Sequence, residues 1–146
     1  MTHPVGVLDT SAVLRLGELE ATDLPTEPLI TTITLAELTV GPLVADDVRT
    51  RAERQLHLQE AEANYGDPLP FDSAAARAFG QIAADLRAGR QKPRARAFDA
   101  LIAATAKAAV LPVYTFNPDD FAGIPGLEVV ALPPARPATS PDEPGG

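Results

Sequence analysis

The sequence predicts an α/β fold: a short, mostly parallel central sheet of four to five strands, covered by helices on both faces. Short apolar runs alternate with helical segments along the chain, which is the order expected when crossover helices join parallel strands. Polar and acidic residues directly follow several of these runs, where open α/β sheets keep their sites. The 146 residues are 45% hydrophobic, enough for one domain with a real core.

Two strand–helix units are expected in the first forty residues. Residues 5–8 form a short apolar run, and the polar residues behind it offer N-cap chemistry for a helix over 12–16. The acidic stretch 17–28 contains two prolines and is expected to be a loop. The β-branched run 29–33 predicts a second strand, which leads directly into a helix over 34–40.

Helices dominate the middle of the chain. Gly41-Pro42 should end the preceding helix, and the charged segment 45–63 has the character of a helix exposed along one face. Residues 68–71 are a third strand candidate, and the helix expected behind them, to about residue 88, shows apolar residues at helical spacing. Segment 96–109 is rich in alanine and lacks glycine and proline, so it predicts a strong helix.

The last third should contain two strands and a tail. Residues 112–115 and 127–132 are the strand candidates. The segment 133–146 is rich in proline, glycine and serine and is expected to be disordered, so we expect a single domain over residues 1–132.

Composition restricts the classes of function. No apolar run approaches the roughly 20 residues of a membrane span, and the N-terminus has no signal-peptide pattern, so we expect a cytoplasmic protein without a membrane partner. The absence of cysteine excludes disulfides and thiolate chemistry. The net charge of -8 disfavours broad, tight binding of nucleic acid through phosphate neutralisation alone.

Basic residues are nevertheless concentrated in one segment. Five of the twelve lie between residues 87 and 96, just ahead of Asp99: Arg87, Arg90, Lys92, Arg94 and Arg96. A solvated helix end and a rim that guides phosphates are equally consistent with this pattern. In the second case Arg94 and Arg96 would contact the substrate.

Carboxylates occupy the junctions between predicted strands and helices. Asp9, Glu37 and Asp99 each stand at such a junction, and the polar turn 117–120 follows the strand candidate 112–115. If the strands are parallel neighbours, all four points meet at one edge of the sheet. Acidic oxygen ligands gathered there would hold Mg²⁺ or Mn²⁺.

Each acid also has a structural interpretation. Asp9 could cap the first helix, although Thr10 or Ser11 could do this instead and leave Asp9 as a ligand. Glu37 fits the third position of a capping box that starts at Thr34, and this role competes with metal binding for the same carboxylate.

A purely structural role is less convincing for Asp99 than for the turn 117–120. Asp99 lies in the first turn of a helix, where an anion is favourable, but its apolar neighbours suggest a buried carboxylate that needs a cation. The segment Asn117-Pro118-Asp119-Asp120 is ordinary turn chemistry as readily as a site. Asn117, Asp119 or Asp120 could complete the acidic cluster.

Four segments in this order resemble a PIN domain, specifically a VapC-type toxin of a bacterial toxin–antitoxin pair. They are Val7-Leu8-Asp9-Thr10-Ser11, Ile33-Thr34-Leu35-Ala36-Glu37-Leu38, Asp99-Ala100-Leu101-Ile102-Ala103-Ala104-Thr105-Ala106 and Tyr114-Thr115-Phe116-Asn117-Pro118-Asp119-Asp120-Phe121. The resemblance spans residues 5–132 and implies a PIN-like three-layer α/β/α fold. It further implies an endoribonuclease that depends on Mg²⁺ or Mn²⁺.

The resemblance also implies roles for individual residues. Asp9, Glu37 and Asp99 match the family's acidic positions, and Asp9 and Asp99 would bind the ion. At the fourth position many members have an aspartate, whereas this chain has Asn117 with Asp120 three residues on. Phe116 stands where arginine is common, and the Thr115 hydroxyl is placed to contact water or phosphate.

The resemblance also implies binding partners and an oligomeric state. The chain would act on an RNA substrate, form a homodimer, and bind a VapB-like antitoxin whose arginine would enter the carboxylate cluster. The charged region 34–63 is the expected place for an antitoxin groove.

Other functions fit the sequence less well. A catalytically inactive binding module on the same fold would keep the acids for capping alone. A phosphoacceptor domain would need a lysine after a late strand, and a D-x-D phosphatase is disfavoured because Thr10 and Ser11 follow Asp9. A Ser-His-Asp triad would have to use His57 in a charged helix.

Overall fold

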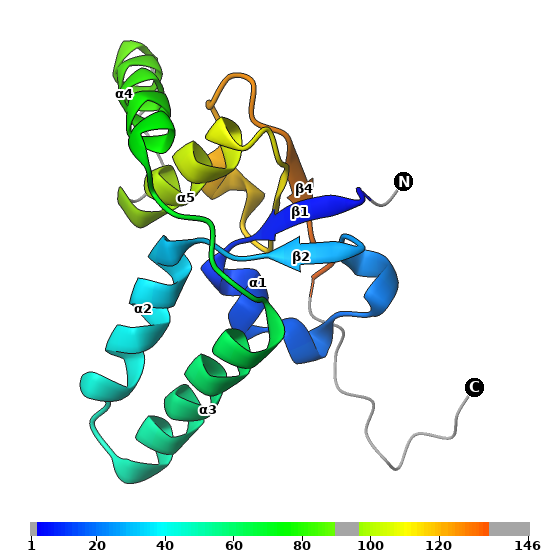
Figure 1. The fold of residues 1–146 in the computed structure, drawn as a ribbon, viewed down its shortest axis with the longest axis vertical. Helices are drawn as coiled ribbons and strands as arrows, with labels where there is room; N and C mark the ends of the chain where they lie inside the picture. Colours follow the sequence, from blue (N-terminus) through cyan, green and yellow to red (C-terminus); the bar gives the residue numbers. More distant parts are fainter. Residues whose placement is uncertain (1–2, 90–96, 135–146) are drawn as a thin grey trace.

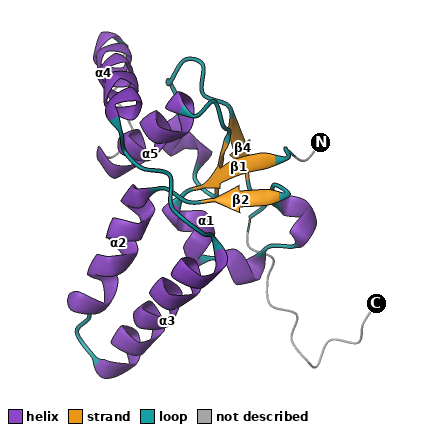
Figure 2. Ribbon diagram, viewed as in Figure 1, coloured by secondary structure: helices purple, strands orange, loops and turns teal. Residues whose placement is uncertain are grey.

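The computed structural model describes residues 3–89 and 97–134, and it has a four-stranded, wholly parallel sheet (Figures 1 and 2). The strands lie in the order β2-β1-β3-β4. Their bounds are β1 Val5–Leu8, β2 Glu27–Leu29, β3 Val113–Thr115 and β4 Val129–Ala131. The expected α/β fold is therefore confirmed.

Helices cover both faces of this sheet. The α-helices are α1 Thr10–Leu14, α2 Thr32–Leu43, α3 Val48–Asn64, α4 Ser73–Ala88 and α5 Ala97–Ala108. Three short 3₁₀ turns, η1 Leu16–Glu18, η2 Ala21–Asp23 and η3 Pro118–Phe121, complete the described elements. Helices α2 and α3 form a hairpin that extends away from the sheet, with α4 toward the opposite end of the molecule (Figure 1). No helix within residues 3–89 and 97–134 has the length and apolar character needed to cross a bilayer.

Side chains of the two central strands point alternately to opposite faces of the sheet, so the core is divided into two layers. In β1, Val7 packs with α4 and α5, whereas Leu8 packs with α1, α2 and α3. In β3, Val113 and Tyr114 divide in the same way. Successive side chains of a strand point to opposite faces, so two buried residues in a row require a helical layer on each side. This is the predicted three-layer arrangement.

The second strand and the helix behind it begin earlier than predicted. Strand β2 ends at Leu29, and Thr31 caps α2 by accepting a hydrogen bond from the Thr34 amide at 3.3 Å. The expected cap at Thr34 is therefore wrong, and Thr34 lies inside the first turn. The predicted strand 68–71 contributes only an isolated bridge between Leu69 and Thr31.

Helix α2 also continues through Gly41-Pro42, where it was expected to stop. Proline cannot donate a backbone hydrogen bond, but near a C-terminus the disturbance is confined to the last turn. Arg54 of α3 donates from Nη1 to the Gly41 carbonyl at 2.9 Å and so satisfies an acceptor that the helix end leaves free. The contact between α2 and α3 thus supports the longer helix.

Helix α5 ends in a Schellman motif with an unusual residue. The Leu111 amide donates to the Ala106 carbonyl at 3.0 Å and the Val110 amide to the Lys107 carbonyl at 3.1 Å. This geometry places Val110 in the left-handed region, with φ of 56°. Glycine usually occupies that position, because a β-branched residue there is strained.

The outer edge of the sheet at β2 carries a proline. The Glu27 amide donates toward β1, to the Pro4 carbonyl at 2.8 Å. Amides of successive residues in a strand point to opposite sides, so the nitrogen of Pro28 faces outward. That edge therefore lacks a hydrogen-bond donor at its middle residue.

Candidate active site

Asp9 lies at the carboxyl end of β1, with only 3% of its surface exposed. Its Oδ1 accepts hydrogen bonds from the Ala12 amide at 2.9 Å and from Ser11 Oγ at 2.7 Å. Its Oδ2 accepts one from Thr115 Oγ1 at 2.6 Å. Asp9 is therefore the N-cap of α1, and the prediction that Thr10 or Ser11 would replace it as the cap is wrong. A carboxylate has about four acceptor positions, so these three bonds still leave room for a ligand.

Within the described residues, no basic side chain compensates the charge on Asp9. Burial raises the pKa of Asp9, the hydrogen bonds from Thr115, Ser11 and Ala12 lower it in part, and the negative charge of Asp120 raises it further. In the part of the chain that the structure describes, no arginine, lysine or histidine forms an ion pair with Asp9. The hydrogen-bond donors to Asp9 are all neutral, so a bound cation would lower both the cost of burying its charge and the repulsion from Asp120.

The second strand of the site is β3, the neighbour of β1. Thr115, its last residue, is fully buried; its hydroxyl donates to Asp9 and accepts from the Asn117 amide at 2.9 Å. The strand order reverses between β1 and β3, which is the switch point where open α/β sheets bind ligands. The expected contact of the Thr115 hydroxyl with water or phosphate stays a prediction, since the bonds seen in the structure are those to Asp9 and the Asn117 amide.

Glu37 is half-buried on α2 and is linked to α1. Its Oε1 accepts a hydrogen bond from Thr10 Oγ1 at 2.7 Å, and Thr10 Oγ1 lies 3.0 Å from Thr34 Oγ1. Since Thr31 is the N-cap, Glu37 lies beyond the first turn of α2 and cannot close a capping box. The capping-box role predicted for Glu37 is therefore wrong.

Asp99 is half-buried in the first turn of α5. The helix is buried along much of its length, from Ala100 to Ala106, but Phe98 beside Asp99 is 55% exposed. The expectation that apolar residues surround Asp99 on all sides is thus wrong for this turn. Burial of α5 begins one residue later.

The polar turn after β3 forms η3. Asn117 and Asp119 are exposed and Asp120 is half-buried, and the Asp120 amide donates to the Asn117 carbonyl at 3.0 Å. Of these three residues, Asp120 is the one whose charge raises the pKa of Asp9. Arg94 and Arg96, the predicted substrate contacts, lie outside the described residues, as does nearly all of the predicted tail.

The acids do not form one ligand set within the described residues. Within residues 3–89 and 97–134, no three histidine or acidic side chains converge closely enough to hold a metal ion. Asp9 and Glu37 are each held by hydroxyl groups, and carboxylates without a cation between them repel one another. The donor type suits a hard divalent cation, and the buried charge of Asp9 gives such an ion a place to bind.

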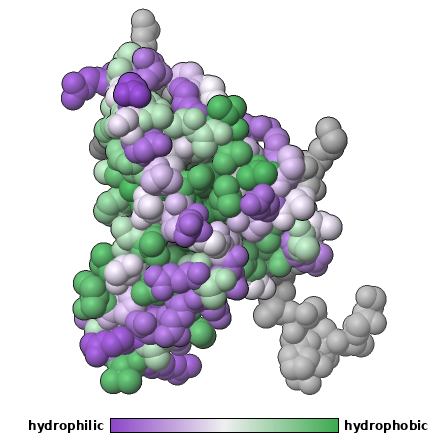
Figure 3. All heavy atoms as spheres, in the orientation of Figure 1, coloured by the Kyte–Doolittle hydropathy of each residue, from purple (hydrophilic) through white to green (hydrophobic). Residues whose placement is uncertain are grey.

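A pocket of about 260 Å³ opens beside Glu37, between α1, α2 and α3. Its lining combines apolar and ionisable side chains: Thr10, Leu14, Glu37, Leu38, Gly41, Arg54 and His57. Large apolar residues of α1, α2, α3 and the turn between α2 and α3 are exposed, and the space-filling view shows hydrophobic surface over α2 and that turn (Figure 3). They are Leu14, Val40, Leu43, Val44, Val48 and Leu56.

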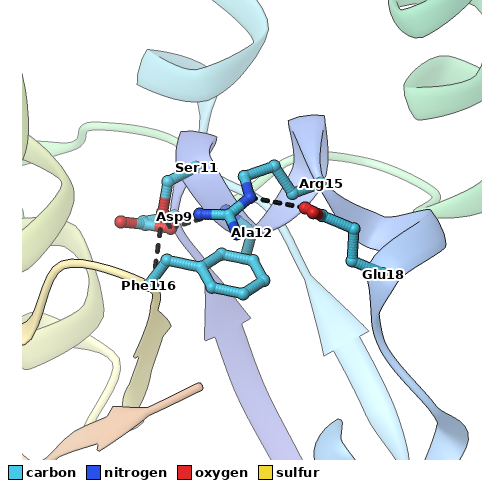
Figure 4. A network of polar contacts seen from close by, with 6 residues as sticks. All are labelled: Asp9, Ser11, Ala12, Arg15, Glu18 and Phe116. Atoms are coloured by element: carbon cyan, nitrogen blue, oxygen red, sulfur yellow. Dashed lines mark hydrogen bonds and ion pairs between the residues drawn. The ribbon is translucent and has the colours of Figure 1, made fainter. Parts of the chain in front are cut away.

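Arg15 was not among the residues predicted for the site. Its guanidinium carbon lies 3.8 Å from the centre of the Phe116 ring, and the Phe116 amide donates to Ser11 Oγ at 3.3 Å (Figure 4). In the sequence, Phe116 is distinguished only by standing where arginine is common in the family. A residue at the end of the first helix gives no sign in sequence of contact with one a hundred positions away.

Comparison with known proteins places this site in a family. The family model of the PIN domain matches residues 6–127. Two ribonucleases of Mycobacterium tuberculosis are similar in sequence. VapC5 is 38% identical over 135 residues, which cover 90% of this chain and 96% of that protein. VapC8 is 36% identical over 104 residues, which cover 70% and 91%.

A solved structure agrees with the sequence comparison. A member of the VapBC family of toxin–antitoxin systems, VapBC-5 from Mycobacterium tuberculosis, superposes with a TM-score of 0.73 at 34% identity. The match covers 88% of this chain and 99% of that one. The family model spans most of the chain, and the relatives share more than a third of its residues over most of their length. The chain therefore belongs to the PIN domain family and is a VapC-type member of it.

Proposed function

We propose that this chain is the toxin of a toxin–antitoxin pair and acts as a Mg²⁺- or Mn²⁺-dependent endoribonuclease. The observation that carries this proposal is the buried carboxylate of Asp9 at the switch point of a parallel sheet, which has no counterion among the residues that the structure describes. The similarity to proteins named as VapC ribonucleases supplies the class of reaction and substrate.

The acids divide into two groups around the ion. Asp9 and Asp99 are the proposed direct ligands, with Glu37 and Asp120 nearer a second ion or its waters and Asn117 at the edge of the cluster. A bound Mg²⁺ or Mn²⁺ would polarise the scissile phosphate and lower the pKa of a water molecule. Cleavage would leave 5′-phosphate and 3′-hydroxyl ends.

The protein's own contacts prepare these side chains. Ser11, Ala12 and Thr115 fix both oxygens of Asp9 through three hydrogen bonds, so little side-chain freedom is lost when a ligand binds. The Thr10 hydroxyl holds Oε1 of Glu37, and Oε2 accepts no hydrogen bond from any described residue. We assign Oε2 of Glu37 to receive the proton of the attacking water.

The assay compares RNA cleavage by wild type, Asp9→Asn, Asp99→Asn and Asp72→Asn, with and without EDTA. Asp72→Asn is the matched control, because Asp72 is also an aspartate N-cap and accepts from the Ala75 amide at 3.0 Å. Asparagine caps helices about as well as aspartate, so both cap substitutions remove charge and keep the cap. We expect cleavage only by wild type and Asp72→Asn, and only with metal. Cleavage that survives EDTA and Asp9→Asn would refute the metal-dependent mechanism.

One observation favours a second function. The acids do not converge into one ligand set within the described residues, as expected of a non-catalytic binding module that keeps this fold. Absence of cleavage of any RNA by the wild-type protein with Mg²⁺ or Mn²⁺ would support that function.

We also propose a VapB-like antitoxin as the partner, since the similar structure is described as a VapBC toxin–antitoxin family member. The pocket beside Glu37 and the exposed apolar residues of α2 and α3 form a suitable groove within the predicted region 34–63. An arginine of the partner in this pocket would reach the carboxylate cluster and block it.

Substitution of Leu43 and Leu56 by alanine tests the groove, with Val110→Ala as the control. Val110 is 89% exposed but lies at the end of α5, outside the groove. We expect the first pair to weaken antitoxin binding and the control to leave it unchanged. Equal affinities for all variants would place the antitoxin elsewhere.

A homodimer, a cytoplasmic location and a nuclease domain over residues 1–132 complete the proposal. Sedimentation of the purified toxin measures the first of these.

A further inference from the structure

The guanidinium of Arg15 is held rigidly beside the acidic site. It stacks on the Phe116 ring at 3.8 Å, and its Nε donates to Glu18 Oε2 at 2.5 Å. In Figure 4 it stands over the ring, with Glu18 on one side and Asp9 and Ser11 on the other. An arginine fixed on one face and one edge has lost most of its rotamer freedom before any ligand arrives.

The other edge of this guanidinium is available. Its two terminal amino groups donate no hydrogen bond to any described residue, and the side chain is 39% exposed. Arg15 forms no ion pair with Asp9 among the described residues. Among the described residues, Arg15 forms its ion pair with Glu18, which is itself 42% exposed.

A short chain of contacts joins Arg15 to the proposed reaction centre. Phe116 carries the stack, its amide donates to Ser11 Oγ, and Ser11 donates to Asp9 Oδ1. The stack therefore keeps a constant position relative to Asp9. A phosphate of a bound strand next to the one being cut would meet the free edge of the guanidinium.

We propose that Arg15, stacked on Phe116, is a positioning residue that binds a backbone phosphate of the RNA adjacent to the scissile one. Glu18 holds the guanidinium while the site is empty and competes with the phosphate for it. The planar fork of arginine suits two phosphate oxygens, and such a charge-assisted pair is stronger than a neutral hydrogen bond. This inference rests on the proposed nuclease function.

The test measures binding of a mixed-sequence single-stranded RNA oligonucleotide by fluorescence anisotropy over a range of salt concentrations. All proteins carry Asp9→Asn to prevent cleavage, and each variant is compared with that background. Arg15→Gln is paired with Arg49→Gln, because Arg49 also forms a local ion pair, with Glu53 at 3.5 Å, on the surface of α3. Glu18→Gln is paired with Glu53→Gln in the same way.

We expect Arg15→Gln to weaken RNA binding about tenfold and to reduce the slope of log affinity against log salt by about 0.7, the value for one phosphate contact on a single strand. Glu18→Gln should tighten binding, and both controls should change it much less. In the cleavage-competent protein, Arg15→Gln should raise KM with little change in kcat, and Arg15→Lys should restore part of the loss.

Two outcomes would overturn the proposal. One is an equal loss and an equal salt slope for Arg15→Gln and Arg49→Gln, which would leave only a general charge effect. The other is unchanged binding by Glu18→Gln relative to Glu53→Gln, a result that does not depend on the folding of the Arg15 variant. If wild type cleaves RNA and either outcome is found, the assignment of Arg15 fails while the nuclease function stands.

Discussion

Replacement of Asp9 by asparagine should stabilise the protein in the absence of metal and abolish stabilisation by metal. Desolvation of a buried carboxylate costs several kcal/mol, and the three hydrogen bonds to Asp9 offset this cost only in part, because its pKa remains raised. Asparagine keeps the cap through its Oδ1, and the Thr115 hydroxyl can rotate to accept from its amide.

The magnitudes follow from linkage. At neutral pH without metal, Asp9→Asn should raise the melting temperature, because the variant removes the buried charge and keeps the cap. Metal at a hundred times its dissociation constant adds about 2.7 kcal/mol to wild type, or about 8 °C, and should add nothing to the variant. The two curves are therefore expected to cross as Mg²⁺ or Mn²⁺ is titrated.

Thermal denaturation followed by circular dichroism, with EDTA and then with increasing MnCl₂, measures both effects. Asp72→Asn serves again as the control and should respond to metal as wild type does. Two results would refute the reasoning. A variant less stable than wild type in EDTA would mean that the Asp9 charge is compensated within the fold. Equal metal-induced shifts in wild type and Asp9→Asn would place the ion elsewhere.

Three further predictions concern stability. The pKa of Asp9 is raised above its ordinary 3.8, so the folded state binds the carboxyl proton more tightly than the unfolded state does. Without metal, the stability of wild type relative to Asp9→Asn should therefore fall as pH rises from 3.8 through the raised value. Urea unfolding of both proteins across this pH range measures the difference. Gly6→Ala should destabilise the protein by about 1–3 kcal/mol in urea unfolding, because the added Cβ would lie 2.6 Å from Tyr114 Cε1. Gly80→Ala should stabilise it by about 0.5–1 kcal/mol, because Gly80 is exposed within a helix and its Cβ would meet nothing within 4 Å. A loss of stability at both positions would contradict this reasoning. Val110→Gly should stabilise by about 1 kcal/mol by relieving the left-handed strain at the end of α5, and an unchanged or lower urea midpoint would show that the strain is absent.

The α/β fold and the first strand–helix unit could be predicted from the sequence because both depend on local patterns. The apolar run before Asp9 forms β1, so that junction could be identified without knowledge of the fold. The expected strand-to-helix junction at Asp99 is wrong, because the described element before α5 is helix α4 and not a strand. The start of α2 could not be predicted in this way. Thr31, Thr32 and Thr34 are all good caps, and the choice depends on where β2 stops pairing with β1, which is a tertiary contact.

The same limit applies to the candidate site. That the turn after β3 contributes an acid was predictable from its composition, but which residue acts on Asp9 depends on how η3 folds back. Asp120 does so and Asn117 contributes its backbone instead. The stack of Arg15 on Phe116 joins the first helix to a late turn, and no local pattern contains that information.

The proline at the edge of β2 has a consequence for how copies of this chain can associate. With no outward donor at Pro28, another strand cannot form a continuous ladder along that edge, and β2 offers only three residues in any case. A sheet that continued from one molecule into the next would have to begin at β4 instead. A blocked edge of this kind guards against the polymerisation to which exposed strands are prone.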